Sequence, residues 1–423
     1  MNKSEPSVSK ILKFPRGFVW GASTASHQVE GNNNNNWSVW EQSDLRQNNL
    51  EKQGLLQKYG IENYVSGTSC SHYNLYKNDF KLAKELNHNA TRISIEWSRI
   101  EPEEGVFDEK EIRHYKDVIK SIRENGMEPF VTIWHWTIPI WLDKKGGWKS
   151  SKISKYFERY TSKLVQTLGP DVNVWITLNE PEIFAGNSYL EGNWPPQEKN
   201  LISYLLVINN LISAHKLAYK AIKKSLPKSK IGLAKNNIYF EAYKNKLNNI
   251  VIKAFIDWWW NRFILDHTAN YLDFIGLNHY FHNKINGWLG KNDNKITSDM
   301  GWELYPEGIY HVLLDLKRYN KPIYITENGL ADAKDEKRTW YIHEILVNTH
   351  KAIKAGVNVK GYLHWSLMDN FEWDSGYWPQ FGLIKVDQKT KSRSIRKSAK
   401  YYAEICKTNK IKDPNPKAMI FPL

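Results

Sequence analysis

Two glutamates in this sequence each come at the end of an apolar run, and together they could perform one kind of chemistry. Glu180 ends ITLNE and precedes Pro181, while Glu327 ends IYITE and precedes Asn328 and Gly329. Two carboxylates flanking a glycosidic bond suffice to hydrolyse it, because one protonates the leaving oxygen while the other attacks or activates water. No metal ion is needed. Either glutamate alone is explained equally well by an ion pair with Arg or Lys, but the two together, each beside an asparagine and a turn signal, favour catalysis.

Three other acidic residues near such runs have simpler interpretations. Glu182 follows Pro181 at a predicted helix start, where the helix dipole favours an acid, so we interpret it as structural. Glu96 and Glu101 flank a further apolar run, and we expect Arg99 to form ion pairs with them.

The elements that must position these residues are eight short apolar runs, rich in Val, Ile and aromatic residues. They do not alternate cleanly between apolar and polar residues, as a half-exposed strand would, so we expect strands buried on both faces. The runs cover residues 18–24, 90–96, 128–136, 174–180, 230–236, 273–280, 322–329 and 359–367.

Between these runs the apolar residues recur with the period of a helix. In residues 108–126, Ile112 and Tyr115 fall on one helical face, Asp108 is placed to cap the start, and Gly126 is placed to end the helix. Similar patterns predict helices around residues 76–83, 157–168, 306–316 and 342–353.

Eight buried strands that alternate with helices, without a linker rich in Pro, Gly or Ser, predict a single (β/α)8 TIM barrel over residues 1–423. We expect residues 1–13 to form a flexible tail. The active site of such a barrel lies at the C-terminal ends of its strands, and polar residues end most of these runs. Glu180 and Glu327, on the fourth and seventh strands, would open onto the same mouth.

The composition excludes several classes of protein. At 423 residues, 41% hydrophobic and 25% charged, the chain can bury a large core, which excludes disorder, collagen and coiled coil.

Its two cysteines cannot form a disulfide framework or a cysteine metal cluster, and their rarity fits a reducing compartment. The N-terminus lacks the apolar core of a secretory signal, and stretches such as AFIDWWWNRFIL are interrupted well before the roughly 20 residues that span a bilayer. We expect a cytoplasmic protein with no membrane among its partners.

The formal net charge of +14 raises the question of nucleic-acid binding. The basic residues lie largely in helix-like or linker stretches, and neither a zinc-finger spacing nor an RNP-like strand accompanies them, so we interpret them as a solvated surface. GxGxxG and GxxxxGK[ST] are both absent. We therefore expect no nucleic-acid partner. The high aromatic content, with 19 Trp and 23 Tyr, could fill a core or line a site that stacks against flat ligand faces.

Four segments, in order along the chain, resemble motifs of glycoside hydrolase family 1, the β-glucosidase and β-galactosidase family. They are FPRGFVWGASTASHQVEG, TLNEP, ITENG, and HWSLMDNFEW followed by FGLIKVD. The resemblance runs from about Phe14 to Tyr402. It implies a retaining enzyme on a (β/α)8 barrel, with no cofactor and no metal.

Motif by motif, the resemblance implies that Glu327 is the nucleophile and Glu180 the general acid/base. The permanent charge of Arg92, at the end of the second strand, would keep Glu327 ionised, and the charge of Glu327 would raise the pKa of Glu180. Tyr280, in FIGLNHY, would donate a hydrogen bond to the nucleophile; the alternative for Tyr280 is core packing.

The resemblance also implies a set of residues that bind the sugar undergoing cleavage. Buried polar groups that pair with hydroxyls discriminate strongly, because an analogue lacking the hydroxyl leaves them unsatisfied. For His135, a packed core histidine is the alternative. The set comprises Gln28, His135, Asn179, Glu372 and Trp373 for hydrogen bonds, Trp365 as the floor, and Trp136 and Asn278 as supporting contacts. For Trp302 and Trp258–Trp260, the sequence does not distinguish among core packing, helix packing and an outer sugar subsite.

Two residues separate branches of the family. Members acting on 6-phosphorylated sugars replace the acid at Glu372, and a carboxylate there would repel a phosphate, so we expect an unphosphorylated sugar. The thioglucosidase branch carries Gln in place of Glu180.

Three positions depart from the family pattern, namely His27, Thr137 and His279, and none of them removes a catalytic group.

The sequence thus predicts a retaining β-glycosidase that removes terminal β-D-glucosyl residues, together with β-D-galactosyl or β-D-fucosyl residues, from short glycosides. A transglycosylase or a β-mannosidase on the same site is the alternative among enzymes. A catalytically silent carbohydrate-binding barrel is the alternative from another class. The sequence leaves the natural substrate and the oligomeric state open, a homo-oligomer included.

Overall fold

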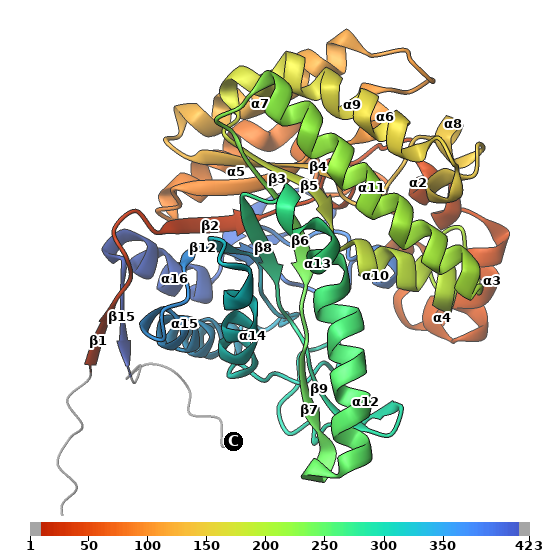
Figure 1. The fold of residues 1–423 in the computed structure, drawn as a ribbon. Coiled ribbons are helices and arrows are strands. Elements are labelled where there is room, and N and C mark those ends of the chain that lie inside the picture. Colours follow the sequence, from red (N-terminus) through yellow and green to blue (C-terminus); the bar gives the residue numbers. More distant parts are fainter. Residues whose placement is uncertain (1–9, 414–423) are drawn as a thin grey trace, which may run out of the picture.

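The computed structural model describes residues 10–413, and a closed barrel of eight parallel strands forms its centre (Figure 1). All eight strands coincide with the predicted apolar runs, so the (β/α)8 fold is confirmed. In chain order they are β2 (Val19–Ser23), β3 (Ala90–Ser94), β4 (Glu128–Trp134), β5 (Val174–Asn179), β6 (Lys230–Asn236), β8 (Phe274–Asn278), β11 (Ile323–Glu327) and β12 (Val359–Trp365).

Helices surround this barrel, and the predicted ones are all present. Asp108 caps α7 as expected, because its carboxylate accepts the backbone N–H groups of Lys110 at 2.7 Å and Glu111 at 3.2 Å. The longer helices are α5 (His72–Glu85), α7 (Glu109–Glu124), α9 (Ile153–Leu168), α11 (Leu201–Ser225), α12 (Leu247–Asp257), α14 (Gly308–Leu316), α15 (Arg338–Lys354) and α16 (Lys397–Thr408). The shorter ones are α1 (Ser26–Val29), α2 (Asn36–Glu41), α3 (Asp44–Lys52), α4 (Leu55–Tyr59), α6 (Trp97–Ile100), α8 (Ile140–Asp143), α10 (Pro181–Ala185) and α13 (Phe263–Thr268).

Two hydrophobic layers hold the barrel together. The larger lies between the strands and the helices, and a smaller cluster gathers residues contributed by the strands themselves. In that cluster the ring of Tyr324 packs edge-on against Phe130 and Phe274, with ring centroids 5.2 Å apart in both cases. The interior of the barrel is therefore packed with side chains, as in other barrels of eight strands.

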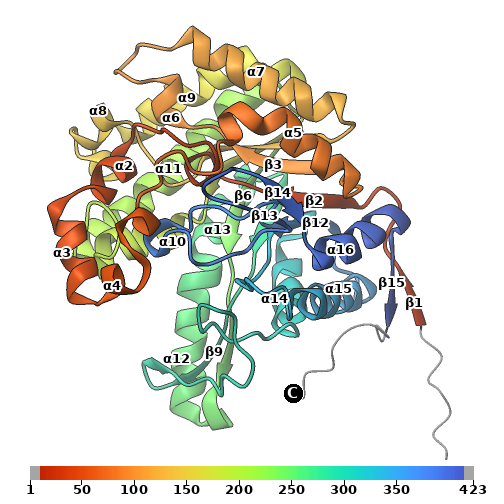
Figure 2. The same cartoon turned by 180° about the vertical axis from the view of Figure 1, so that it is seen from behind.

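Short sheets outside the barrel were not expected from the sequence. Strands β7 (Tyr239–Ala242), β9 (His282–Asn286) and β10 (Leu289–Gly290) form a three-stranded sheet within the connections that follow β6 and β8. Figures 1 and 2 show this sheet and α12 projecting together from the body of the molecule. A second pair, β13 (Ile384–Val386) and β14 (Arg393–Ile395), lies near the C-terminus.

The expectation that residues 1–13 form a flexible tail is wrong for the last four of them. Lys10–Lys13 form β1, which pairs antiparallel with β15 (Lys410–Asp413). Leu12 on β1 and Ile411 on β15 are buried, so the pairing gains apolar contacts as well as backbone hydrogen bonds. Residues 1–9 lie outside the described residues.

One helix among the described residues, α11, is long and apolar enough to cross a membrane by length and composition. Its Val207, Leu211 and Ala218 are buried, and the imidazole Nδ1 of His215 lies 2.7 Å from Thr177 Oγ1 on β5. Core helices pass the same length and composition test, so this finding is weak support for a spanning segment.

Gly21 lets two barrel strands approach closely. A Cβ atom built on Gly21 of β2 would lie 1.9 Å from the backbone carbonyl oxygen of Ala90 on β3. At Gly186, by contrast, a Cβ would meet nothing within 4 Å, and the backbone there is helical. The barrel therefore leaves no space for a side chain at Gly21, whereas the helical turn after α10 has room for one at Gly186.

We expect Gly21→Ala to lower the free energy of unfolding by about 3 kcal/mol, because the backbone of β2 or β3 must shift to accept the methyl group. Gly186→Ala is the matched control and should change it by less than about 1 kcal/mol. Chemical denaturation followed by tryptophan fluorescence measures both. Equal effects of the two substitutions would contradict this account of the contact between β2 and β3.

Candidate active site

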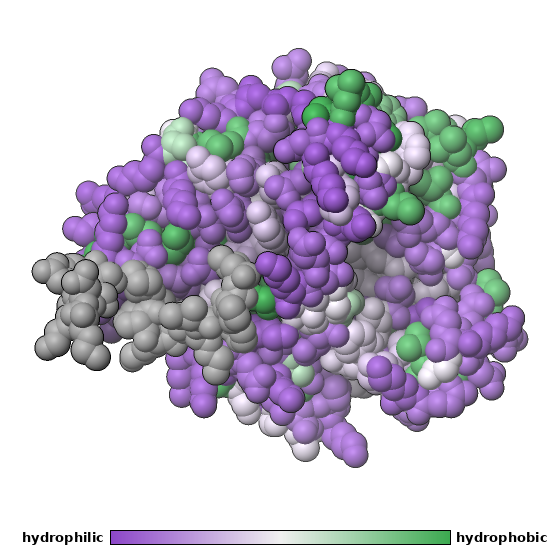
Figure 3. All heavy atoms as spheres, turned by 90° about the horizontal axis from the view of Figure 1, so that it is seen from below, coloured by the Kyte–Doolittle hydropathy of each residue, from purple (hydrophilic) through white to green (hydrophobic). Residues whose placement is uncertain are grey.

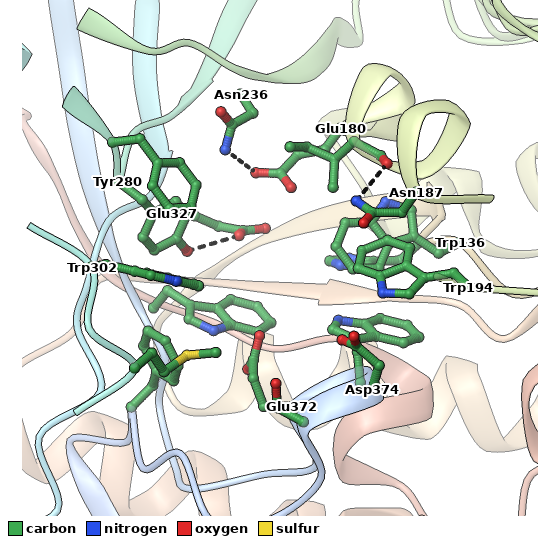
Figure 4. Close-up of a pocket in the computed structure, with 18 residues that line it drawn as sticks. Trp136, Glu180, Asn187, Trp194, Asn236, Tyr280, Trp302, Glu327, Glu372 and Asp374 are labelled. Carbon is green, nitrogen blue, oxygen red and sulfur yellow. Dashed lines mark hydrogen bonds between the residues drawn. The ribbon is translucent and has the colours of Figure 1, made fainter. Parts of the chain in front are cut away.

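A cavity opens at the C-terminal ends of the barrel strands, and both predicted carboxylates line it. Glu327 is the last residue of β11, and Glu180 directly follows β5. Figure 4 shows their side chains pointing toward each other, with Tyr280 beside Glu327 and Asn236 beside Glu180. Strands four and seven of the barrel thus bring the two acids to one site, as the sequence predicted.

The backbone is irregular just before each of these carboxylates. The pairing of β5 with β6 shifts register between Ile176 and Asn179, and that of β11 with β8 shifts between Ile325 and Glu327. Such irregularities redirect side chains that would otherwise alternate between the two faces of a strand. Glu180 also has a φ of 41°, in the left-handed region that residues other than glycine rarely adopt. Local backbone distortion therefore aims the side chains into the cavity.

Glu327 is held by a buried cation and by a hydroxyl group. The fully buried guanidinium of Arg92 forms an ion pair with Glu327 Oε1, and the Tyr280 hydroxyl donates to Oε2 at 3.0 Å. Burial raises the pKa of Glu327, while the charge of Arg92 and these hydrogen bonds oppose that rise. The contacts favour the charged carboxylate, which is the form that can attack a carbon atom.

Glu180 has a different environment, because its hydrogen-bond donors are neutral amides. Glu180 Oε1 accepts from Asn278 Nδ2 at 2.9 Å and from Asn236 Nδ2 at 3.1 Å. Burial raises the pKa of Glu180 to about 8, and the negative charges of Glu327 and Glu182 contribute to the rise. The Glu180 carboxyl therefore holds its proton at neutral pH and can donate it.

Asn179 connects these groups to the far wall of the cavity. Its Oδ1 accepts from Arg92 at 2.6 Å and from Asn278 at 3.1 Å, and its Nδ2 donates to His135 Nε2 at 3.0 Å. One amide side chain thus fixes the positions of a guanidinium, a second amide and an imidazole.

Two buried polar atoms of the predicted sugar-binding residues, His135 Nδ1 and Gln28 Oε1, have no hydrogen-bond partner among the described residues. Burial lowers the pKa of His135 well below its ordinary value, and Asn179 donates to Nε2, so the neutral ring carries its proton on Nδ1. The amide nitrogen of Gln28 donates to Asn370 Oδ1 at 2.9 Å, which leaves Gln28 Oε1 as an acceptor. A free donor and a free acceptor match the hydrogen-bonding needs of sugar hydroxyls.

Aromatic rings form one wall of the cavity. The ring of Trp136 packs against those of Trp373 and Trp194, with centroids 4.6 Å apart in both cases. Trp373 also stacks on His135, at 5.9 Å and an interplanar angle of 17°. The wall thus presents rigid apolar faces suited to the C–H faces of a sugar ring, beside polar groups suited to its hydroxyls.

Glu372 adds a third carboxyl group to the cavity. Gln28 Nε2 donates to Glu372 Oε2 at 3.3 Å. Burial raises the pKa of Glu372 to about 8, with contributions from the charges of Glu327 and Asp374. The side chain is therefore a neutral hydrogen-bonding group at neutral pH and itself supplies no positive charge to offset a phosphate.

The structure brings all the predicted site residues together. Eight of them line the cavity, namely His135, Trp136, Glu180, Tyr280, Glu327, Trp365, Glu372 and Trp373. The other four, Gln28, Arg92, Asn179 and Asn278, each form a hydrogen bond to one of those eight.

Sequence reasoning did not single out several further lining residues. Asn236 ends β6, so the rule that polar residues mark the C-terminal ends of strands could have found it. Trp302, whose role the sequence left open, lies in the lining. The others come from loops and short helices and carry no such signal: Ile183, Asn187, Trp194, Phe281, Met300, Asp374, Ser375 and Phe381.

The expectation that Arg99 forms ion pairs with Glu96 and Glu101 is wrong. Arg99 Nε donates to Glu30 at 2.9 Å, and it contacts neither Glu96 nor Glu101 by an ion pair within the described residues. Glu101 pairs with Arg159 instead. Glu101 lies two residues after Arg99, a spacing at which side chains on a helix do not face each other. Glu96 precedes α6 with an extended backbone, and its carboxylate accepts from Thr137 and Asn35 instead.

Two of the departures from the family pattern, Thr137 and His27, are linked through Glu96 and Asn35. The Thr137 hydroxyl lies 3.0 Å from both carboxylate oxygens of Glu96, and Asn35 Nδ2 donates to Oε1 at 3.2 Å. Asn35 Nδ2 also lies 3.1 Å from His27 Nδ1, so His27 Nε2 donates to Glu41 at 2.8 Å. The departures thus belong to one buried network, which lies against the aromatic wall through the stacking of His27 on Trp373 at 5.5 Å.

Glu182 has the structural role expected of it. Its carboxylate accepts from Lys235 Nζ at 2.9 Å and from the backbone N–H of Asn236 at 2.8 Å. It is not among the residues that line the cavity.

The reactive groups of the cavity are carboxyl, hydroxyl, amide and aromatic side chains. Within residues 10–413, no group of three or more His, Cys, Asp and Glu side chains is placed to hold a metal ion.

The chain matches the model of a known family over almost all of the part that the structure describes. The family is Glycosyl hydrolase family 1, and the matched residues are 11–272 and 267–411. Among curated relatives, Beta-glucosidase A of Thermotoga maritima is 34% identical, over 95% of this chain and 100% of its own length. A Beta-galactosidase of Pyrococcus woesei is 31% identical, over 94% of this chain and 97% of its own length.

Solved structures resemble the whole fold. The beta-glycosidase from Pyrococcus horikoshii has a TM-score of 0.86 at 36% identity, covering 96% of this chain and 97% of that one. The Beta-glucosidase from Thermotoga maritima in complex with glucoimidazole has a TM-score of 0.85 at 32% identity, covering 94% and 99%.

We expect the Glu180 carboxyl to titrate near pH 8 and its pKa to fall when Glu327 is replaced by Gln. The substitution removes a negative charge that disfavours ionisation of Glu180, while burial still holds the pKa above its ordinary value of 4.5. Carbon-13 NMR of labelled glutamate side chains, assigned with Glu180→Gln, measures this pKa. A Glu372→Gln variant serves as the control, because it removes the other cavity carboxyl whose pKa is raised to about 8 and which could be confused with Glu180. An unchanged or higher pKa of Glu180 in Glu327→Gln would contradict the coupling.

Proposed function

The chain belongs to glycosyl hydrolase family 1, and we propose that it is a retaining exo-β-glycosidase acting on short, unphosphorylated β-glycosides. One observation carries the proposal: two carboxyl groups line one cavity, Glu327 paired with a buried arginine and Glu180 with its pKa raised to about 8. This is the division of labour that double displacement requires, a charged nucleophile and a protonated acid at the same pH.

In the first step, Glu327 attacks the anomeric carbon of the terminal sugar. The bond from that carbon to the leaving oxygen breaks, and the Glu180 carboxyl transfers its proton to that oxygen. The aglycone leaves as an alcohol, and the sugar remains as an ester on Glu327. Tyr280 and Arg92, which contact the Glu327 carboxylate, hold it in position for the attack.

In the second step, Glu180 acts as a base. The ester has removed the negative charge of Glu327, so the pKa of Glu180 falls and its carboxylate form can accept a proton from water. The water oxygen attacks the anomeric carbon, the ester bond breaks, and Glu327 is restored as a carboxylate. Two inversions at one carbon return the original β configuration.

The sugar is recognised by the groups that the structure leaves available. His135 Nδ1 offers a donor and Gln28 Oε1 an acceptor, and Glu372 adds a carboxyl group beside them. A phosphorylated sugar would place its negative charge near the charged Glu327, and Glu372 supplies no positive charge to offset it, so an unphosphorylated sugar is favoured. The aromatic wall, with Trp136 and Trp373 at its centre, supports the ring.

The relatives support the choice of sugar. Those named above are a β-glucosidase and a β-galactosidase, and a similar structure holds glucoimidazole. We therefore propose terminal β-D-glucosyl residues as substrates, with β-D-galactosyl and β-D-fucosyl residues accepted as well.

The scarcity of cysteine, together with the burial of both Cys70 and Cys406, supports the proposal of a cytoplasmic location.

Release of p-nitrophenol from the β-glucoside, β-galactoside, β-fucoside and β-mannoside tests this function. We expect the first three to be hydrolysed by the wild type and hydrolysis to cease in Glu327→Ala, because no nucleophile remains. Glu180→Gln should lose roughly 10²- to 10⁴-fold on glycosides with poor leaving groups and less on activated ones, which need little protonation.

Glu191→Gln is the matched control, since Glu191 is exposed at the end of the helical turn that follows α10, and it should keep full activity. Comparable turnover by Glu327→Ala would contradict the mechanism. The β-mannoside rate and product analysis with sugar acceptors identify a mannosidase or a transglycosylase, and inactivity of the wild type on all four glycosides would favour a binding barrel.

A further inference from the structure

Helix α12 is apolar on two sides. Ile252 and Ile256 pack inward against a buried apolar cluster that includes residues of β7 and β9, while Leu247, Val251 and Phe255 are 78%, 62% and 53% exposed. A surface helix of a globular protein ordinarily turns its apolar stripe toward the core. The exposed face of α12 therefore has no partner in the part of the chain that the structure describes.

Two neighbouring elements expose large apolar side chains as well. At the start of α11, Leu201 and Ile202 are 59% and 79% exposed, and in the turn between β9 and β10, Trp288 and Leu289 are 72% and 75% exposed. Single exposed apolar residues are common on protein surfaces, but a contiguous group of them marks an interaction site.

Hydrogen bonds link the three elements at the two ends of α12. The indole N–H of Trp259, in the π-helical turn after α12, donates to the Tyr204 hydroxyl on α11 at 3.1 Å. At the other end of α12, the backbone N–H of Gly287 donates to Asn249 Oδ1 at 2.9 Å. The exposed side chains lie along these linked elements, and we refer to them together as the apolar rim: Leu201, Ile202, Leu247, Val251, Phe255, Trp288 and Leu289.

The apolar rim lies on the same end of the barrel as the candidate active site. Its three elements belong to the connections that follow β5, β6 and β8, and these connections begin at the C-terminal ends of the strands. Figures 1 and 2 show α12 and β9 projecting beyond the body of the molecule. Figure 3, which views the molecule from that projecting side, shows several separate hydrophobic patches, with the most extensive toward the upper right of the face.

Lysines outnumber acidic residues around the apolar rim. Residues 243–256 and 284–291 contain five lysines and no Asp or Glu. Two of these lysines, Lys253 and Lys284, form ion pairs with Asp257 and Asp293 just outside these ranges. Lys244 and Lys291 lie over the ring of Tyr243, at 5.5 Å and 4.9 Å from its centroid. Exposed Leu, Val, Phe and Trp side chains bordered by lysines are the composition of a helix that lies in the interface of an anionic lipid bilayer.

A second copy of this chain fits the apolar rim less well. A twofold interface would set the surface against itself and would bring the same lysines of both copies together, at an electrostatic cost. The rim is also a projecting edge, and a lipid surface can deform around such an edge.

We propose that the apolar rim binds the surface of an anionic lipid bilayer. The apolar side chains enter the boundary between headgroups and acyl chains, and the lysines contact the lipid phosphates. The mouth of the candidate active site then lies on the side that meets the membrane. The binding is peripheral and needs no spanning helix, so it replaces our expectation from the sequence that no membrane is among the partners.

Sedimentation with lipid vesicles tests the proposal on the full chain. We expect the protein to sediment with vesicles of phosphatidylglycerol and phosphatidylcholine, and less with phosphatidylcholine alone or at high salt. The double variant Leu247→Asp and Phe255→Asp should lower the partition coefficient at least about tenfold, because two apolar side chains are lost and two negative charges are added.

The matched control is the double variant Val39→Asp and Val106→Asp, since both valines are about as exposed, at 55% and 53%, but lie on other elements. It should sediment nearly as the wild type does. Hydrolysis of a soluble p-nitrophenyl glycoside should be unchanged in both double variants, which shows that they are folded.

Three results would overturn the proposal. They are no sedimentation with anionic vesicles at low salt, an equal loss in the control variant, and a dimer in the absence of lipid that the Leu247→Asp and Phe255→Asp variant abolishes without any vesicle binding. The last result would assign the apolar rim to a second copy of the chain. Because vesicle binding does not depend on turnover, the outcome is independent of the function proposed for the cavity.

Discussion

The site depends above all on one buried charge, the guanidinium of Arg92 inside the barrel. Arg92 has no exposed surface, so it must be paired and hydrogen-bonded to offset the cost of leaving water. Its partners come from three other strands: Thr132 on β4, Asn179 on β5 and Glu327 on β11. Removing any partner would leave part of a buried cation uncompensated. The ion pair therefore fixes where Glu327 lies, and the negative charge of Glu327 contributes to the raised pKa of Glu180.

Around this pair, the barrel supplies rigidity and the loops supply the shape of the cavity. The packed interior, with Tyr324 between two phenylalanine rings, forms a firm floor beneath the polar ends of the strands. Register shifts in β5 and β11 then redirect their last residues into the cavity. The aromatic wall comes from outside the strands, where Trp136 and Trp373 both have a positive φ, at 79° and 48°. Such backbone conformations carry a cost in stability that the surrounding packing must offset.

The sequence predicted the eight strands because a strand buried on both faces leaves a continuous apolar run, and it predicted Glu180 and Glu327 because charged residues are conspicuous at the ends of such runs. It did not reveal the register shifts, because they depend on the pairing of two strands far apart in the chain. The partner of Arg99 was wrong for a similar reason, since nearness in sequence does not fix direction on a one-turn helix. Strand β1 (Lys10–Lys13) resembles a tail in the sequence because it forms only by pairing with β15 at the other end of the chain, which the local sequence does not show. The apolar residues of α12 are plain in the sequence, but only the structure shows which of them pack inward and which stay exposed.

The account rests most directly on the claim that Glu327 becomes covalently bonded to the sugar. Incubation with an activated 2-deoxy-2-fluoro-β-glucoside, which forms the glycosyl-enzyme readily and hydrolyses slowly, should trap that ester. Proteolysis and mass spectrometry should then find the fluorosugar on the peptide that contains Glu327, and Glu327→Ala should remain unlabelled. A label on Glu180 or Glu372, or inactivation without any label, would contradict the account.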